Sequence, residues 1–212
     1  PRSNNVSVIF EDRKKNIWVG HRMPAGVDQY QEDSDKFLHL VVRDTGMIVF
    51  NNPRISSMVQ GDSGLIWFGT NNGVYGIVTD RDTVVNMDEG TINTTNYIRY
   101  SENNGLLSNE VSGMILHRNK LWVSTNRGVS QIDLLTKQIT NYDEYDGLQK
   151  GRFYPGAIIK KSTGHILIGG SNGISIFHPD SLNYNSVVPN IAITDMLVLN
   201  KIVTIDTSKS AI

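Results

Sequence analysis

Four short apolar runs recur along the chain, each flanked by polar and turn-forming residues. Three are centred on a tryptophan, at Trp18, Trp67 and Trp122, and the fourth has Leu167 in the same place. The runs are rich in β-branched and aromatic residues, and they are continuous rather than alternating, as expected for strands covered on both faces. No long stretch has the 3.6-residue periodicity of an amphipathic helix. The pattern therefore predicts an all-β protein built from repeated short strands.

The spacing of these runs predicts a β-propeller. The four central positions are separated by 49, 55 and 45 residues, close to the roughly 40 to 50 residues of one blade with variable loops. Each repeat is expected to form four short antiparallel strands. In the first repeat the innermost strand is expected at residues 6–11, and in the second repeat the second strand is expected at 65–70. Third strands are expected at 74–78, 129–133 and 174–178, and outer strands at 97–101 and 139–143.

A glycine marks the same corner in three repeats. Gly73, Gly128 and Gly173 each follow the central residue of their repeat by six positions. Glycine adopts positive φ without steric cost, so the constant offset predicts one shared turn between the second and third strands. In the first repeat this corner is two residues longer and ends at Gly26. The glycines and the four central residues are thus expected to be structural anchors of the blades, with the tryptophans packed in the core rather than used to stack sugars.

The repeats resemble a known family. Residues 67–74 read WFGTNNGV and residues 122–129 read WVSTNRGV. The tripeptide NGL at 104–106 precedes the third repeat, and DGL at 146–148 precedes the fourth. This pattern is similar to the two-component regulator propeller repeat. The resemblance spans roughly residues 4–184; it is weaker in the first repeat, which has an insertion after His21, and in the fourth, which lacks the Asp and the Trp. It implies blades of a larger propeller, commonly seven-bladed, in the periplasmic part of a hybrid sensor histidine kinase.

A second resemblance lies at the C-terminal end. Residues 188–203 read VPNIAITDMLVLNKIV, in which Ile191, Ile193, Met196 and Val198 fall on alternating positions around a turn, after Pro189. This segment is similar to the opening strands of the three-tyrosine (Y_Y_Y) domain, an immunoglobulin-like module that follows such propellers. The resemblance implies that a second domain begins here.

The domain boundaries follow from these observations. Propeller blades are expected over residues 1–185, at about 4–54, 55–109, 110–154 and 155–185, and the start of the Y_Y_Y domain over 186–212. Because the chain begins at Pro1 without a basic or apolar leader, we expect a processed or excised segment of a larger receptor. The first and last blades would then expose apolar faces, which favours a homodimer or contact with a missing half.

Composition excludes several classes of partner. Lys and Arg number 20 against 21 Asp and Glu, for a net charge of -1, so nothing favours binding to nucleic acid or to an anionic membrane. Cysteine is absent, which excludes disulfides and thiolate metal sites. The five histidines have no ligand spacing, so no metal is expected. No apolar run of about 18 residues is present, so membrane attachment is expected only through segments outside this chain.

Motifs for catalysis are also missing. The sequence contains no nucleotide-binding loop, no HExxH, no GxSxG and no EF-hand spacing. Acidic pairs such as Glu11 with Asp12, and Asp143 with Glu144, could suggest the two carboxylates of a glycosidase. Their placement at turns favours local hydrogen bonding to the backbone instead. We therefore expect no catalytic residue and no cofactor in this chain.

The candidate ligand-binding residues lie in loops that a propeller gathers at one end. These loops connect second to third strands and outer strands to the next inner strand, and loops on a rigid scaffold commonly carry binding residues. Arg and Asn side chains there suit hydrogen bonding to a saccharide, and Arg suits a carboxylated or sulfated one. The candidates are His21, Arg22, Asn71, Asn72, Asn109, Glu110, Arg127, Arg152, Tyr154 and Asn172.

The leading hypothesis is a non-catalytic sensor fragment that recognises a carbohydrate breakdown product, an oligosaccharide, in the periplasm. The carbohydrate and the location are implied by the family resemblance. One alternative is a propeller enzyme of the streptogramin-inactivating lyase kind, which needs a central metal or base. The inner strands offer no histidine at repeat-equivalent positions, which speaks against this enzyme. A stoichiometric divalent ion bound to the chain would favour the enzyme. Another alternative is a structural propeller that supports receptor dimerisation.

Overall fold

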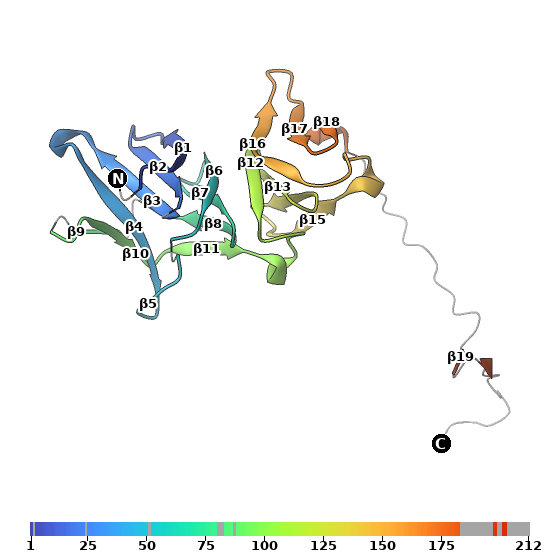
Figure 1. Ribbon diagram of the computed structural model, residues 1–212, viewed down its shortest axis with the longest axis horizontal. Helices are drawn as coiled ribbons and strands as arrows, with labels where there is room; N and C mark the ends of the chain where they lie inside the picture. Colours follow the sequence, from blue (N-terminus) through green and yellow to red (C-terminus); the bar gives the residue numbers. More distant parts are fainter. Residues whose placement is uncertain are drawn as a thin grey trace. The chain divides into compact units, whose positions relative to one another are not determined.

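The protein is all-β, as the sequence pattern predicts. A computed structural model describes residues 1, 3–23, 25–50, 52–79, 83–86, 88–182, 197–198 and 201–202. These residues form separate sheets joined by short loops and four single 3-10 turns (Figure 1). None of the described segments is a helix with the length and apolarity needed to cross a lipid bilayer. The fold is that of β-propeller blades.

Four sheets repeat the same up-and-down order, and their inner strands contact one another in chain order. The first blade contains β1 (Val6–Glu11), β2 (Ile17–Arg22), β3 (Ala25–Gln31) and β4 (Lys36–Asp44), with β5 (Met47–Ile48) paired to β4. The second contains β6 (Ile55–Gln60), β7 (Ile66–Thr70), β8 (Gly73–Ile77) and β11 (Tyr97–Tyr100). The third contains β12 (Val111–His117), β13 (Lys120–Thr125), β14 (Val129–Asp133) and β15 (Ile139–Tyr142). The fourth contains β16 (Phe153–Lys160), β17 (Ile166–Gly170) and β18 (Gly173–Phe177).

The first blade departs from the expected four strands. Between β8 and β11 the second repeat carries an insertion that forms β9 (Thr83–Asn86) and β10 (Thr91–Thr94). β10 pairs in parallel with β4 of the first blade, and β9 pairs antiparallel with β10. This insertion lengthens the spacing between the second and third tryptophans, and it explains why that spacing exceeds the other two.

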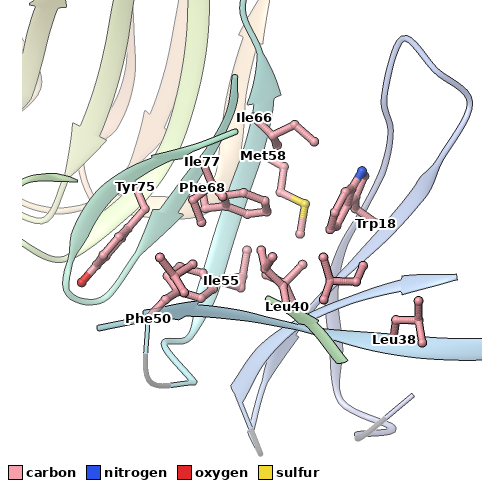
Figure 2. Packing of buried hydrophobic residues seen from close by; sticks show 13 residues of the cluster. Trp18, Leu38, Leu40, Phe50, Ile55, Met58, Ile66, Phe68, Tyr75 and Ile77 are labelled. Carbon is pink, nitrogen blue, oxygen red and sulfur yellow. The ribbon is translucent and has the colours of Figure 1, made fainter. Parts of the chain in front are cut away.

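Trp18 fills the space between the first two blades. Its side chain is fully buried, and its ring lies 6.3 Å from that of Phe68 at 74°, an edge-on contact. Leu40 and Met58 belong to the same buried cluster (Figure 2). Because Trp18 and Leu40 come from the first blade and Met58 and Phe68 from the second, this cluster binds the two blades together.

The next two tryptophans repeat this role. Trp67 is buried in a cluster with Met114 of the third blade. Trp122 is buried against Phe177 of the fourth blade, with ring centres 5.0 Å apart. Leu167, in the equivalent place of the fourth blade, is only partly buried. The prediction that the tryptophans pack in the core is confirmed.

A serine near the start of the inner strand joins neighbouring blades. Ser7 Oγ donates a hydrogen bond to the Ile55 carbonyl oxygen of the second blade at 2.6 Å. Ser112 Oγ donates to the Phe153 carbonyl oxygen of the fourth blade at 2.9 Å, and this bond is buried. The same repeat position carries Ser56 in the second blade. These bonds run between the inner strands of neighbouring blades and fix how far each strand is shifted lengthwise relative to the next.

The corner glycines adopt the backbone conformation that their spacing predicts. Gly73, Gly128 and Gly173 have φ of 95°, 150° and 110°, and Gly26 has 119° at the longer corner of the first blade. All four values lie in the region that favours glycine. The predicted shared turn is therefore confirmed.

The chain divides into two compact units, residues 1–181 and 182–212. The four blades form the first unit. In the second, β19 (Leu197–Val198) pairs antiparallel with β20 (Lys201–Ile202) as a short hairpin. The expected Y_Y_Y strand positions Ile191, Ile193 and Met196 lie outside the described residues.

Candidate functional site

The polar residues singled out from the sequence lie near one end of the blades, although His21 and Arg22 are the last residues of β2 and Tyr154 lies in β16 rather than in a loop. At this end the corners between second and third strands meet the links that lead to the next inner strand, and we call it the corner end. For example, the Asn71 backbone N–H donates to the Arg54 carbonyl oxygen at 3.3 Å, and the Gly73 N–H donates to the Asn109 carbonyl oxygen at 2.8 Å. Corners and links of successive blades thus form one continuous surface.

A pocket of about 60 Å³ at the corner end brings together residues from all four blades. Arg22 comes from the first blade, Arg54 and Asn71 from the second, Glu110 from the third and Pro155 from the fourth. We call it the four-blade pocket; Ile55, Ser56 and Val111 complete its lining. Three of the predicted residues, Arg22, Asn71 and Glu110, therefore meet in one place.

The geometry of the four-blade pocket is set by Arg54. Its Nη2 lies 3.3 Å from Glu110 Oε1, and its backbone N–H donates to Asn71 Oδ1 at 2.8 Å. Glu110 Oε2 also accepts a hydrogen bond from Asn126 Nδ2 at 3.4 Å. The pocket thus presents guanidinium, carboxylate and carboxamide groups, all of which can hydrogen-bond hydroxyl or anionic groups of a ligand.

A second pocket at the corner end contains Arg127. It has a volume of about 250 Å³, and Asp143, Glu144, Tyr145 and Gln149 also line it. Tyr145 is 90% exposed. An exposed aromatic ring beside donors and acceptors is an arrangement suited to a sugar ring, because the ring packs on C–H groups while the polar side chains bind hydroxyl groups.

Three of the predicted asparagines stabilise the loops instead of projecting freely. Asn72 Oδ1 accepts a hydrogen bond from Arg99 at 2.7 Å. Asn109 exchanges two bonds with Glu102, at 2.9 and 3.0 Å. Asn172 Nδ2 donates to the Lys150 carbonyl oxygen at 2.6 Å. Their side chains therefore hold the loops of the corner end in place.

Arg152 and Tyr154 form a pair of their own. The Arg152 guanidinium lies over the Tyr154 ring, 5.6 Å from its centre, which is a cation–π geometry. Tyr154 is 44% exposed and is adjacent to Pro155 of the four-blade pocket. The pair therefore extends the polar surface toward the fourth blade.

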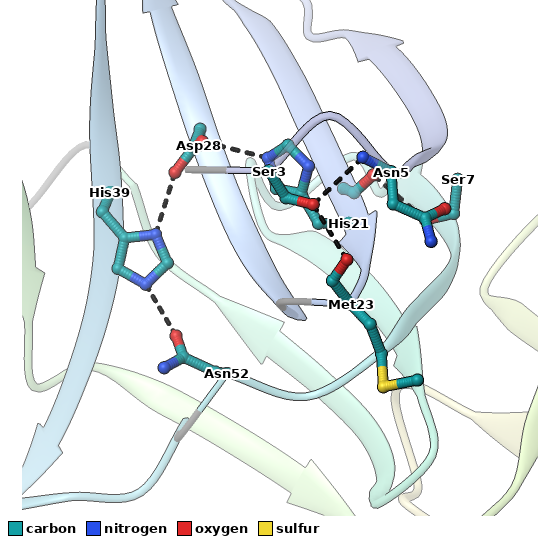
Figure 3. Close-up of polar contacts among 9 residues, drawn as sticks. Ser3, Asn5, Ser7, His21, Met23, Asp28, His39 and Asn52 are labelled. Atoms are coloured by element: carbon teal, nitrogen blue, oxygen red, sulfur yellow. Dashed lines mark hydrogen bonds and ion pairs between the residues drawn. The ribbon is translucent and has the colours of Figure 1, made fainter. Parts of the chain in front are cut away.

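His21 is fully buried and does not reach the corner-end surface. Its Nε2 is hydrogen-bonded to Asp28 Oδ2 at 3.0 Å, and Asp28 Oδ1 is hydrogen-bonded to His39 Nδ1 at 2.9 Å (Figure 3). His39 Nε2 continues the chain to Asn52 Oδ1 at 2.9 Å. The network connects β2, β3 and β4 with the link before β6. Except for His21 Nδ1, which is buried without a partner among the described residues, the ring nitrogens and the Asp28 carboxylate are hydrogen-bonded, which fixes the position of that link.

Sequence reasoning missed Arg54, Tyr145 and the partners of His21. Arg54 could have been found from the repeat, because it precedes the first residue of an inner strand just as Glu110 and Arg152 do. Tyr145 lies in a 3-10 turn, Glu144–Asp146, that the sequence analysis assigned only to turn formation. Within the described residues, no group of three or more His, Asp or Glu side chains is arranged to hold a metal ion.

Comparison with known proteins supports the expected class. Residues 1–22 and 49–72 match the two component regulator propeller family, and they cover the inner hairpins of the first two blades. The third repeat, whose residues 122–129 also carry the resemblance, lies outside these matched segments. These two segments of the β-propeller are therefore similar to two component regulator propeller repeats.

Individual relatives agree with this class. Histidine kinase P4 of Formosa agariphila is 23% identical over 238 residues, covering 94% of this chain and 17% of that protein. The extracellular domain of the putative hybrid two component system BT3049 from B. thetaiotaomicron superposes with a TM-score of 0.68 at 22% identity, over 97% of this chain and 27% of that one. For the corresponding domain of BT4673 the TM-score is 0.66 at 18% identity, over 94% and 27%. This chain thus spans 17% of the histidine kinase and 27% of each of the two extracellular domains.

Proposed function

We propose that the chain is a non-catalytic, extracytoplasmic sensor segment of a hybrid two-component histidine kinase. The observation that carries the proposal is the Trp-centred repeat, which matches two component regulator propeller sequences and adopts the fold of hybrid two component system ectodomains. The similarity to a histidine kinase over nearly the whole chain supports the same parent. A periplasmic location and a following Y_Y_Y domain belong to the proposal.

The ligand that we propose is a carbohydrate breakdown product, bound at the corner end. Arg22, Arg54 and Glu110 offer charged hydrogen-bonding groups in the four-blade pocket, and Tyr145 offers an exposed ring in the neighbouring pocket. Both arginines also suit a carboxylate or sulfate substituent on the sugar, which a guanidinium binds through two parallel hydrogen bonds.

Signalling requires that the ligand bind one arrangement of the receptor better than another, because a ligand shifts an equilibrium only by its difference in affinity for the two states. We propose a homodimer whose arrangement changes on binding, with the segment after the blades relaying the change toward the kinase. A pocket lined by residues of four blades suits this role, since its ligand contacts several sheets at once.

The test is the signalling response of the intact receptor to an oligosaccharide panel, with Arg54→Ala as the principal variant. Arg13→Ala is a matched control, because Arg13 also pairs with a carboxylate of a neighbouring sheet, at 2.6 Å from Asp62 Oδ1, but lies on a hairpin away from the corner end. We expect Arg54→Ala to raise the concentration for half-maximal response about tenfold, from loss of a charged hydrogen bond. Arg13→Ala is expected to leave it unchanged.

Two outcomes would contradict the proposal. If no oligosaccharide elicits a response, the carbohydrate is excluded as the ligand. If the receptor responds but Arg54→Ala, Arg22→Ala and Tyr145→Ala all behave as wild type, the blades serve only as a structural support for dimerisation.

A further inference from the structure

In the first blade a buried carboxylate completes the hairpin next to the tryptophan. Asp12 Oδ1 accepts hydrogen bonds from the backbone N–H groups of Lys14 and Asn16, at 2.8 and 2.9 Å. Asp12 Oδ2 accepts from the Trp18 indole Nε1 at 2.9 Å. Asn16 Nδ2 also donates to Oδ2 at 2.9 Å, so two backbone N–H groups, the indole N–H and one carboxamide converge on a carboxylate that is only 4% exposed.

The second blade has the same hairpin without the carboxylate. Gly61 stands where the first blade has Asp12, six residues before the tryptophan. The Gly61 N–H donates to the Leu65 carbonyl oxygen at 3.1 Å, as Asp12 donates to Asn16 at 3.0 Å. Gly64 has φ of 81° where Lys15 has 70°. The backbone thus follows the same path. The backbone N–H groups of Ser63 and Leu65 correspond to those of Lys14 and Asn16, and the Trp67 indole N–H corresponds to that of Trp18.

This replacement leaves the Trp67 indole without an acceptor. Trp67 is 2% exposed, and its buried Nε1 has no hydrogen-bond partner in the part of the chain that the structure describes. The next carboxylate along, Asp62, lies 2.6 Å from Arg13 and its side chain is 79% exposed, so it does not take the place of Asp12. A buried donor without a partner is costly, since its hydration is lost without compensation.

A pocket of about 180 Å³ opens beside this indole, between the second and third blades. Its walls are mainly apolar, with Leu65, Ile98 and Tyr100 from the second blade and Leu116 and Leu134 from the third. The charged or small polar residues among the lining are Asp62, Ser63, Arg118, Asn119 and Lys137. The two cations outnumber the one acid, so the local charge favours an anionic ligand.

We propose that this pocket binds a small carboxylic acid with an apolar body. The carboxylate would occupy the place that the Asp12 side chain holds in the first blade, and accept hydrogen bonds from Trp67 Nε1 and the backbone N–H groups of Ser63 and Leu65. The apolar body would lie between the leucines of the two blades. The volume limits the ligand to about the size of one ring, well below that of a drug-sized molecule. This site is separate from the corner end.

The experiment is a titration of the full chain, labelled with ¹⁵N on its tryptophans, with benzoate. The structure predicts a downfield shift of the Trp67 indole N–H resonance that saturates with benzoate. The Trp122 indole, which is buried and also has no partner among the described residues, serves as the internal control and should not shift. Benzamide, the neutral analogue, should bind about tenfold more weakly because its hydrogen bonds are not charge-assisted.

Two variants make the result specific. Gly61→Asp supplies a carboxylate in place of the ligand; Gly61 is not at positive φ, and an added Cβ would lie 3.5 Å from Trp67 Nε1, an ordinary contact. It should shift the Trp67 resonance in the absence of benzoate and abolish the titration. Trp67→Phe keeps an aromatic ring but removes the donor, and should weaken benzoate binding about tenfold by calorimetry. The proposal is overturned if benzoate leaves the Trp67 resonance unchanged, if Gly61→Asp titrates like wild type, or if Trp67→Phe binds equally well.

Discussion

At the scale of single residues, the Asp12 carboxyl illustrates how one side chain holds a blade hairpin. Burial acts to raise its pKa, but hydrogen bonds from the Trp18 indole, from the Asn16 side chain and from the backbone outweigh burial and hold the pKa below the ordinary value of 3.8. Because the folded pKa is the lower one, the ionised group stabilises the fold above pH 3.8, and this contribution is lost as the pH falls through the folded value.

We expect Asp12→Asn to lower the free energy of unfolding by about 1 to 2 kcal/mol at neutral pH, since the carboxamide cannot accept all of these bonds. The difference between wild type and variant should shrink as the pH falls below 3.8. Urea unfolding measured from pH 7 down to pH 3 (roughly the range of carboxyl titration) checks this. Asp33→Asn, at an exposed turn, is the control. A difference that stays constant with pH would show that ionisation of Asp12 is not the stabilising factor.

At the scale of structural elements, the corner between second and third strands is repeated but not equally crowded. A Cβ on Gly73 would lie 2.3 Å from the Tyr100 carbonyl oxygen, and one on Gly128 would lie 2.5 Å from that of Tyr142. Gly173 has the same positive φ but nothing within 4 Å of its Cβ position, in a blade with only three described strands. The outer strand is therefore what makes the corner glycine sterically necessary.

Replacing these glycines by alanine separates the cost of positive φ from the cost of the steric clash with the outer strand. Gly173→Ala should cost about 1 kcal/mol of stability, from the positive φ alone. Gly73→Ala should cost about 1 to 3 kcal/mol more, because its methyl group displaces the backbone of β11. Thermal unfolding of the two variants gives the comparison, and equal losses would contradict the assigned contact with Tyr100.

The strands could be predicted from the sequence because their signals are local. The expected strands at residues 6–11 and 129–133 match β1 and β14 at both ends. The parallel pairing of β10 with β4 could not be predicted, since it joins segments about fifty residues apart and leaves no periodic signal in either. The serine bonds between inner strands were missed for the same reason, although Ser7, Ser56 and Ser112 share a repeat position.

The candidate site was predictable only in part. The topology of a propeller places Arg22, Asn71 and Glu110 at one end, and the structure brings them into one pocket. Sequence alone could not distinguish these from Asn109, whose hydrogen bonds are formed with Glu102 of the same loop, or from His21, which is fully buried and hydrogen-bonded to Asp28 of β3. Residue type and loop position indicate the surface, but side-chain partners decide which groups remain available.

At the scale of the whole molecule, the fourth blade exposes the face that carries the tryptophan in the other blades. Ile159, Leu167 and Ile176 are aligned across β16, β17 and β18, so their side chains share one face. Ile159 and Ile176 are both 61% exposed. No sheet among the described residues covers them, whereas each tryptophan is covered by the following blade.

We therefore expect the isolated chain to self-associate through this face. The double variant Ile159→Thr, Ile176→Thr keeps β-branched residues in the strands but removes apolar surface, and it should shift the chain toward monomer in size-exclusion chromatography with light scattering. Leu135→Ser, which removes an exposed leucine elsewhere, is the control. A wild-type chain that is already monomeric and thermally robust would contradict this expectation.

We propose that these blades take part in ligand recognition at the corner end. The most direct measurement is isothermal titration calorimetry of the complete receptor ectodomain with an oligosaccharide panel that includes carboxylated and sulfated members. We expect heat of binding for at least one member, with affinity about tenfold weaker in Arg54→Ala and an unchanged melting temperature. Absence of heat from every member, or binding that is indifferent to the corner-end residues, would contradict it.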